Sequence, residues 1–136
     1  MIDYETDIYD TVVERVRTVF QNDELEIAGD TLKKPAKLPF MSIEEINNYT
    51  DEATMTTDNG DVFAVVTYDV NIYTNDISGK KIHAKRILEV VDEAFVSLNF
   101  RRVQKDIVPN LSDATVYRIT ARYRAVVGHD GKLYRR

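Results

Sequence analysis

The sequence predicts an α+β fold: two amphipathic helices packed on one face of an antiparallel or mixed β-sheet of four to five strands, in the order α-β-β-α-β-β. Two segments show apolar residues at helical spacing, and two others show long alternation of apolar and polar residues, which is typical of strands. Strands that follow one another along the chain favour antiparallel pairing, with the helices together on one side.

The first helix is expected at residues 3–20. Asp and Glu gather in its first turns, where the helix dipole favours negative charge. Its apolar stripe is formed by Ile8, Val12, Val13, Val16, Val19 and Phe20. Gly29, Pro35 and Pro39 indicate that residues 21–39 form a connector, with a short strand at Leu25 to Ile27.

A hairpin is expected after a strand at residues 40–46. Asn59 and Gly60 both tolerate the positive φ of a two-residue turn, and residues 62–73 alternate cleanly behind them. The strand before the turn, about 49–57, is polar and rich in threonine. Residues 48–61 are therefore expected to project from the body as an arm.

The second helix is expected to start at an N-cap formed by Ser78 and to run to Leu98. Asn99 can adopt the left-handed conformation that ends many helices. Its buried stripe is formed by Ile87, Val90, Val91, Ala94, Phe95 and Leu98. Two more strands follow, at residues 101–108 and about 113–127.

Composition indicates one folded domain spanning residues 1–136, with a basic tail at 128–136. Hydrophobic residues make up 43% of the 136 and there is no cysteine, so a disulfide framework is excluded. The start MIDYETDIYD is acidic, and no apolar run approaches the roughly 20 residues of a membrane span. We therefore expect a cytosolic product with no membrane contact.

Charge is distributed unevenly along the chain. Residues 1–100 carry nine Lys/Arg against 20 Asp/Glu, a balance of −11, whereas residues 101–136 carry nine Lys/Arg against three Asp, a balance of +6. The two parts restore the net charge of −5. The basic end could contact nucleic acid, or it could meet the acidic part of a neighbouring copy.

The last long strand carries a row of arginines. Arg118, Arg122 and Arg124 alternate with apolar residues, so they share one face and point away from the core. Asp69 and Asn71 are expected on the same face. The simplest interpretation is a solvated face with cross-strand ion pairs. Exposed pairs stabilise a fold by only about 0.2 to 1 kcal/mol, however, so contact with a partner is a better reason for the row.

The sequence shows no catalytic, cofactor or metal signature, and we expect no enzyme. His83 and His129 are the only histidines, and a zinc site needs three or four convergent ligands. Glu44 and Glu45 are adjacent on a strand and so face opposite ways. The DNGD motif lacks the downstream glutamate of a calcium loop. No phosphate-binding loop, dinucleotide fingerprint or nucleophile elbow occurs.

Three stretches carry a family resemblance: VTYDVNIYTNDISGKK, ILEVVDEAFVSLNFRRVQ, and VPNLSDATVYRITARYRAVV with its closing LYRR. They resemble the small tail-terminator (tail-completion) proteins of long-tailed bacteriophages and prophages. The likeness runs from about residue 40 to the end and less distinctly through the first helix. The likeness concerns the order of the elements, the length of the chain and these short stretches of sequence, since the family has no catalytic motif to match.

The resemblance implies a ring-shaped oligomer, usually a hexamer, at the neck end of a virion tail. Such a ring binds the tail tube protein, ends tube polymerisation and presents its other face to head–tail connector proteins, with DNA only in transit. Arg118, Arg122 and Arg124 with Asp69 and Asn71 are the expected subunit or tube interface, and Asp58, Asn59 and Asp61 in the arm are a second contact element. Alternatives are a head-completion or neck protein, a nucleic-acid-binding domain, and a phage-encoded hydrolase or toxin.

Overall fold

The computed structural model describes residues 2–21, 25–29, 37–50, 63–108, 115–128 and 132–134. Its elements, in chain order, are α1 (Glu5–Val19), β1 (Glu26–Ala28), β2 (Phe40–Thr50), β3 (Phe63–Thr74), α2 (Lys80–Ser97), β4 (Arg101–Val108), β5 (Tyr117–Gly128) and β6 (Leu133–Tyr134). The predicted α+β class is confirmed.

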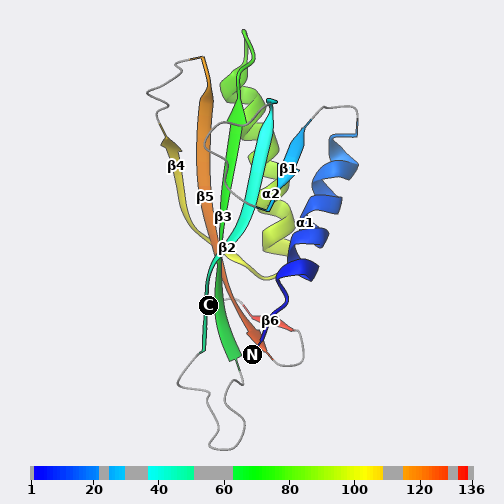
Figure 1. The fold of residues 1–136 in the computed structure, drawn as a ribbon, viewed down its shortest axis with the longest axis vertical. Coiled ribbons are helices and arrows are strands. Elements are labelled where there is room, and N and C mark those ends of the chain that lie inside the picture. Colours follow the sequence, from blue (N-terminus) through cyan, green and yellow to red (C-terminus); the bar gives the residue numbers. More distant parts are fainter. Residues whose placement is uncertain are drawn as a thin grey trace, which may run out of the picture.

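The strands of the described residues form one mixed sheet. Its order is β1-β2-β3-β5-β4, and β6 pairs with β5 off this path. β1 runs parallel to β2, and every other pairing is antiparallel. β4 and β1 therefore lie at opposite edges of the sheet, as Figure 1 shows.

Both helices lie on the same side of the sheet (Figure 1). α2 packs against β3, β4 and β5, and α1 packs against α2. One apolar cluster joins the two helices to the sheet. It includes Val12, Val16, Ile87, Val91, Met41, Ile43, Val70, Ile72, Ile119 and Ala121. The two amphipathic stripes recognised in the sequence are thus the faces that close this core, except that Val19, placed in the first stripe, is 55% exposed near the end of α1.

Four aromatic side chains fill the centre of the core. The ring of Phe95 stacks on Tyr123, with centroids 4.4 Å apart and ring planes 7° from parallel. It also meets Phe100 edge-on at 5.1 Å, and Phe100 in turn meets Tyr68 at 5.5 Å. All four are almost completely buried. Because stacked and edge-on geometries favour defined ring positions, this cluster fixes α2 over β3 and β5.

The element order differs from the expected one by the short strands. β1 lies one residue later than the expected strand at Leu25 to Ile27, and the two-residue β6 was not expected. A strand this short carries too few residues to show alternation. It forms because a longer neighbouring strand offers unpaired backbone groups.

β2 is longer than expected, because it continues past residue 46 to Thr50. A register shift between Glu45 and Asn47 keeps it paired with β3, and Thr50 lies opposite Ala64. Residues 48–50 are therefore part of the sheet rather than of an arm. The remainder of the proposed arm, including the Asn59-Gly60 turn, lies outside the described residues.

The expected N-cap at Ser78 is wrong. α2 begins at Lys80, and the residue before it, Gly79, has φ +85°. Glycine adopts this left-handed conformation without a Cβ clash, so the chain turns into the helix one residue later than the serine indicated. At the other end, Asn99 has φ 66°, which confirms the predicted left-handed terminator. Its side-chain amide donates a hydrogen bond to the Leu133 carbonyl in β6 at 3.1 Å.

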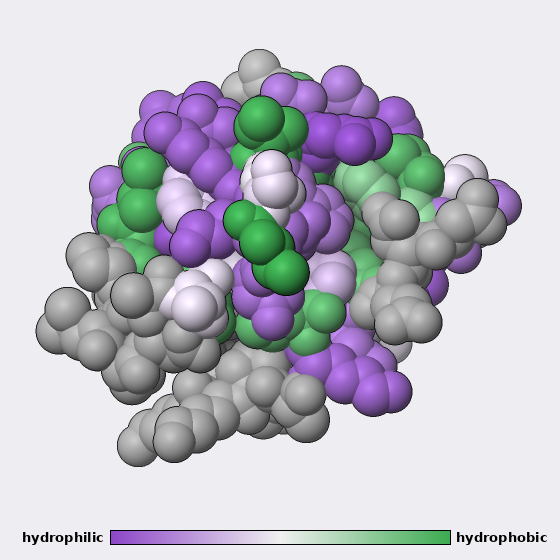
Figure 2. All heavy atoms as spheres, turned by 90° about the horizontal axis from the view of Figure 1, so that it is seen from above, coloured by the Kyte–Doolittle hydropathy of each residue, from purple (hydrophilic) through white to green (hydrophobic). Residues whose placement is uncertain are grey.

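The most exposed large apolar side chains of the described residues are Ile77, between β3 and α2, and Ile82, in the first turn of α2. Figure 2 looks onto the upper end of the molecule as drawn in Figure 1, and shows hydrophobic atoms in small groups separated by hydrophilic ones. Scattered apolar atoms of this kind are normal on a protein surface. Among the described helices, none combines the length and the apolar character needed to cross a membrane.

Candidate functional site

The sheet has a second face that lies opposite the helices. Residues paired directly across neighbouring strands share a face, and Tyr68 and Tyr123 lie on the helix side. The residues that come directly before and after them along each strand therefore point to the opposite side of the sheet. We call this second surface the polar face. Its polar members are Ser42, Glu44, Asn47, Thr67, Asp69, Asn71, Arg101, Gln104, Asp106, Arg118, Thr120, Arg122 and Arg124. The expected common face for Arg118, Arg122 and Arg124 is confirmed.

Arg118 is engaged within the chain. Its Nε and Nη2 donate hydrogen bonds to Asn71 Oδ1 at 3.2 and 2.8 Å. The guanidinium also lies over the ring of Tyr73, 5.2 Å from the centroid, and that ring contacts Phe40. The guanidinium of Arg118 therefore binds a buried amide and covers an aromatic ring. These contacts give Arg118 a structural role within the chain.

Asp69 connects three more side chains of the polar face. Its Oδ2 accepts from Asn71 Nδ2 at 3.1 Å, and its Oδ1 accepts from Thr120 Oγ1 at 3.3 Å. Arg122 Nε approaches the same Oδ1 at 3.4 Å, in an ion pair whose arginine side chain is 48% exposed. The cross-strand ion pair considered from the sequence is therefore present, but it uses only part of Arg122.

The polar face is less solvated than expected. Asn71 was expected to face away from the core, and it does, as does Thr67, yet both are buried. The physical reason is lateral packing: residues two apart on one strand and opposite on the next contact one another, so the long side chains of β5 cover the shorter ones of β3. The expected contact residues Asp58, Asn59 and Asp61 lie outside the described residues.

Arg124 and Arg101 lie directly opposite each other on β5 and β4. Neither makes an ion pair or hydrogen bond within the described part of the chain. Like charges placed opposite one another destabilise a sheet, so these two arginines, the basic pair, are electrostatically unsatisfied. Sequence reasoning found Arg124 but missed Arg101, because only the strand register brings the two together.

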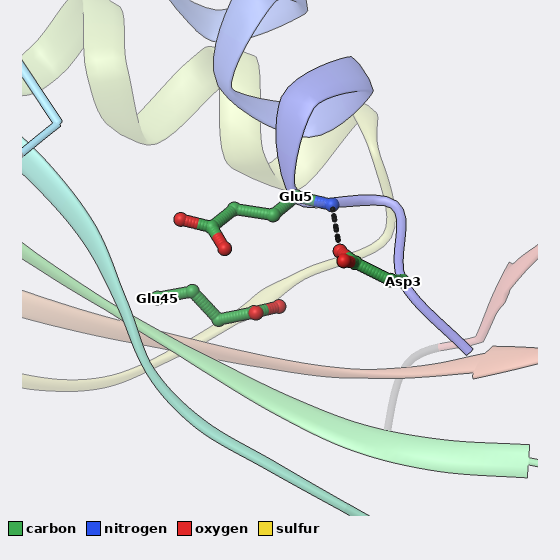
Figure 3. Close-up of side chains that lie close together, drawn as sticks. All are labelled: Asp3, Glu5 and Glu45. Carbon is green, nitrogen blue, oxygen red and sulfur yellow. Dashed lines mark hydrogen bonds between the residues drawn. The ribbon is translucent and has the colours of Figure 1, made fainter. Parts of the chain in front are cut away.

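A group of carboxylates lies on the helix side, near the start of α1. Figure 3 shows Asp3, Glu5 and Glu45 directed toward one another, with the Glu5 amide donating to Asp3 Oδ1 at 3.1 Å. One oxygen from each lies within 4.8 Å of the others. Exposed acidic groups are common in proteins without a bound ion, and we call these three residues the acidic patch.

The acidic patch changes the protonation of one of its members. Burial, and then the negative charge of Glu5, raise the pKa of Glu45 from 4.5 to about 7, although a hydrogen bond from Tyr68 opposes the shift. The Tyr68 hydroxyl donates to Glu45 Oε1 at 3.3 Å. Burial likewise raises the pKa of Tyr68 and of Tyr123, which donates to Asp92 Oδ1 at 2.9 Å. Both hydroxyls therefore remain protonated donors in the core.

Two shallow depressions lie along the α1 surface, each with a volume of about 240 Å³. They are lined by Tyr4, Asp7, Ile8, Thr11, Leu98 and Leu133, and by Thr11, Glu14, Arg15, Thr18, Ala94 and Ser97. Neither brings together a nucleophile and a base. His83 is elsewhere, with Nδ1 3.0 Å from Asp76 Oδ1, and His129 lies outside the described residues. The described residues thus assemble charged contact surfaces, and no reactive constellation is found among them.

Replacing Glu45 with glutamine is expected to stabilise the fold above about pH 7 and to change little below about pH 4.5. A carboxyl whose pKa is higher in the folded state favours folding at low pH, and this contribution is lost as pH rises through the folded pKa. The wild type should therefore lose about 1 to 2 kcal/mol across this range, a value reduced because solvent screens a partly exposed group. Urea unfolding at about pH 5 and pH 8 measures the difference. Equal stability of the two proteins at the higher pH would contradict it.

This chain is similar to a known protein in its fold. No protein-family model matches the chain, and no curated protein matches it. Among solved structures, its fold is similar to that of a chain in the "virion of native gene transfer agent (GTA) particle", with a TM-score of 0.52 and 13% identity. The match covers 90% of this chain and 96% of that chain. The described fold is therefore one that a virion chain also adopts over nearly its whole length.

Proposed function

We propose that this chain is a structural protein of a phage-type virion and acts as a tail terminator. The observation that supports this best is the fold it has in common with 96% of a gene transfer agent virion chain. The sequence resemblance to tail-terminator proteins supplies the finer assignment. In this role the protein forms a ring, a hexamer by that resemblance, that caps the tail tube, ends its polymerisation and receives the head connector.

The geometry suits a protein that acts through its surfaces. A cyclic ring is built from heterologous contacts, in which one patch of a protomer meets a different patch of the next. Arg122, half exposed, and Arg124, without a partner in the described residues, are the arginines of the original row that remain able to dock. Arg118 is committed to Asn71 and Tyr73. The proposed arm with Asp58, Asn59 and Asp61 remains a second contact element in this proposal.

The test is a particle preparation that lacks this gene product. We expect tails of irregular length that do not join heads, seen by electron microscopy, because nothing stops tube growth or forms the joint. Supplying the wild-type chain should restore uniform tails. Uniform tails that join heads normally without the protein would overturn the proposal.

A second measurement separates the terminator from a neck protein. The purified chain is mixed with tail tube protein, and separately with the head connector, and the complexes are imaged. Rings seated on tube ends support the terminator role. Rings that bind only the connector would replace it with the head-completion role, and salt-sensitive binding to DNA alone would replace it with a nucleic-acid-binding domain.

A further inference from the structure

The basic pair lies on the β4 side of the sheet, where no carboxylate of the described residues pairs with it. Arg101 is exposed and Arg124 is partly exposed, and they face each other across two neighbouring strands. Nearby acidic residues of the polar face are used elsewhere: Asp69 by Arg122, Asn71 and Thr120, and Asp106 by Gln104. An anionic group from outside would relieve the repulsion between the two guanidinium groups.

The opposite charge gathers along α1 and the residues just before it. Every carboxylate from residue 2 to residue 14 is exposed, and no basic residue occurs before Arg15. We call these residues the acidic edge: Asp3, Glu5, Asp7, Asp10 and Glu14. None of them forms an ion pair within the described residues. Asp3 accepts a hydrogen bond from the Glu5 amide, but no cation of the described residues neutralises the acidic edge.

The fold places these two surfaces on opposite sides of the sheet, because the basic pair belongs to the polar face and α1 lies on the helix side. Figure 1 shows α1 beside β1 at one side and β4 at the other, with β2, β3 and β5 between them. One copy therefore cannot bring its own surfaces together. A second copy placed beside it in the same orientation brings a basic pair next to an acidic edge, and repetition of that contact produces a ring if the rotation closes.

We propose that the basic pair of one copy docks on the acidic edge of the next, as a head-to-tail contact between identical chains. This inference rests on the proposed ring, and it deepens it by naming both sides of the subunit contact. Two arginines that are already close can bind adjacent carboxylates bidentately, which sets the orientation as well as the attraction. Attraction of this kind is expected to weaken as salt rises.

A nucleic acid is the other polyanion that could bind the basic pair. Two arginines supply few phosphate contacts, whereas sequence-independent binding relies on many. The net charge of −5, with exposed carboxylates along α1, opposes approach to DNA. The same carboxylates are what a second copy needs, so the second copy is the favoured partner.

Charge reversal and charge exchange test the contact. Arg101→Glu with Arg124→Glu should weaken self-association by about tenfold or more, because like charges then meet. Asp7→Lys with Asp10→Lys should do the same. A chain that carries all four changes should associate again, since its surfaces are complementary with exchanged signs. Sedimentation of the full chain at about 0.05 M and about 1 M salt measures the mass, with circular dichroism to confirm folding.

The matched control is Lys85→Glu with Arg86→Glu on the exposed side of α2, which shifts the net charge by the same four units. It should associate like the wild type.

The proposal is overturned if the wild type stays monomeric in every condition, if Arg101→Glu with Arg124→Glu associates normally, or if the four-fold exchange fails to restore association. Loss of DNA binding with association unchanged would assign the basic pair to nucleic acid instead. Abnormal tails in the particle without this protein, together with normal rings from Arg101→Glu/Arg124→Glu, would sink this contact and leave the terminator role intact.

Discussion

Replacing Phe95 with alanine is expected to lower the free energy of unfolding by about 3 to 5 kcal/mol. Phe95 has no exposed surface, and its ring contacts Tyr68, Phe100 and Tyr123 at the point where α2 crosses the sheet. Alanine removes the transfer free energy of the ring and leaves a cavity that rigid strands cannot close. Urea unfolding at about 25 °C, followed by circular dichroism, measures the loss.

Val96→Ala provides the control, because Val96 is the next residue of the same helix and is exposed. It should change stability by about 0.5 kcal/mol or less. If the alanine variant at position 95 does not fold, Phe95→Leu retains most of the apolar volume and should show an intermediate loss. A loss below about 1 kcal/mol for Phe95→Ala would contradict the packing of α2 on β3 and β5.

Arg118→Ala is expected to cost about 2 to 3 kcal/mol of stability, although Arg118 is a surface-type residue. Two charge-assisted hydrogen bonds to the buried Asn71 oxygen and the contact with the Tyr73 ring are lost together, and the Asn71 oxygen remains buried without a donor. Lysine at this position should recover only part of the loss, since one ammonium cannot form the fork.

Arg122→Ala is the comparison on the same strand, with one long ion pair and a half-exposed side chain. It should cost about 1 kcal/mol or less. Unfolding curves for the two alanine variants separate a structural arginine from one available for docking. Equal losses would show that the Asn71 network contributes nothing and would return Arg118 to the group of candidate docking residues.

Local patterns in the sequence predicted the main elements well. The bounds of α1, β3 and β5 match the expected ones to within a few residues, since apolar residues recur with the period of the helix or strand whose one face packs on the core. Asn99 was identified for the same local reason, because few residues tolerate positive φ. Ser78 misled because an N-cap preference is weaker than the turn made by the glycine that follows it.

The candidate site was only partly predictable. Alternation placed Arg118, Arg122 and Arg124 on one face, but nothing local distinguishes an arginine bound to Asn71 from one opposite Arg101. Glu45 is distant in sequence from Asp3 and Glu5, and it meets them only because α1 begins beside β2. Alternation along the strand correctly placed Glu44 and Glu45 on opposite faces of the sheet. It could not predict that Glu45 meets Asp3 and Glu5, because those residues belong to another element.

The sequence alone determined which residues of each element face the core. Hydrophobic burial follows a period of two residues in strands and 3.6 residues in helices, and both periods are visible in the sequence. The sequence also determined the uneven charge, which is a matter of composition. Strand order and register decided which charges neutralise one another and which remain without a partner among the described residues, because Coulomb interactions depend on distances that exist only once remote segments have come together.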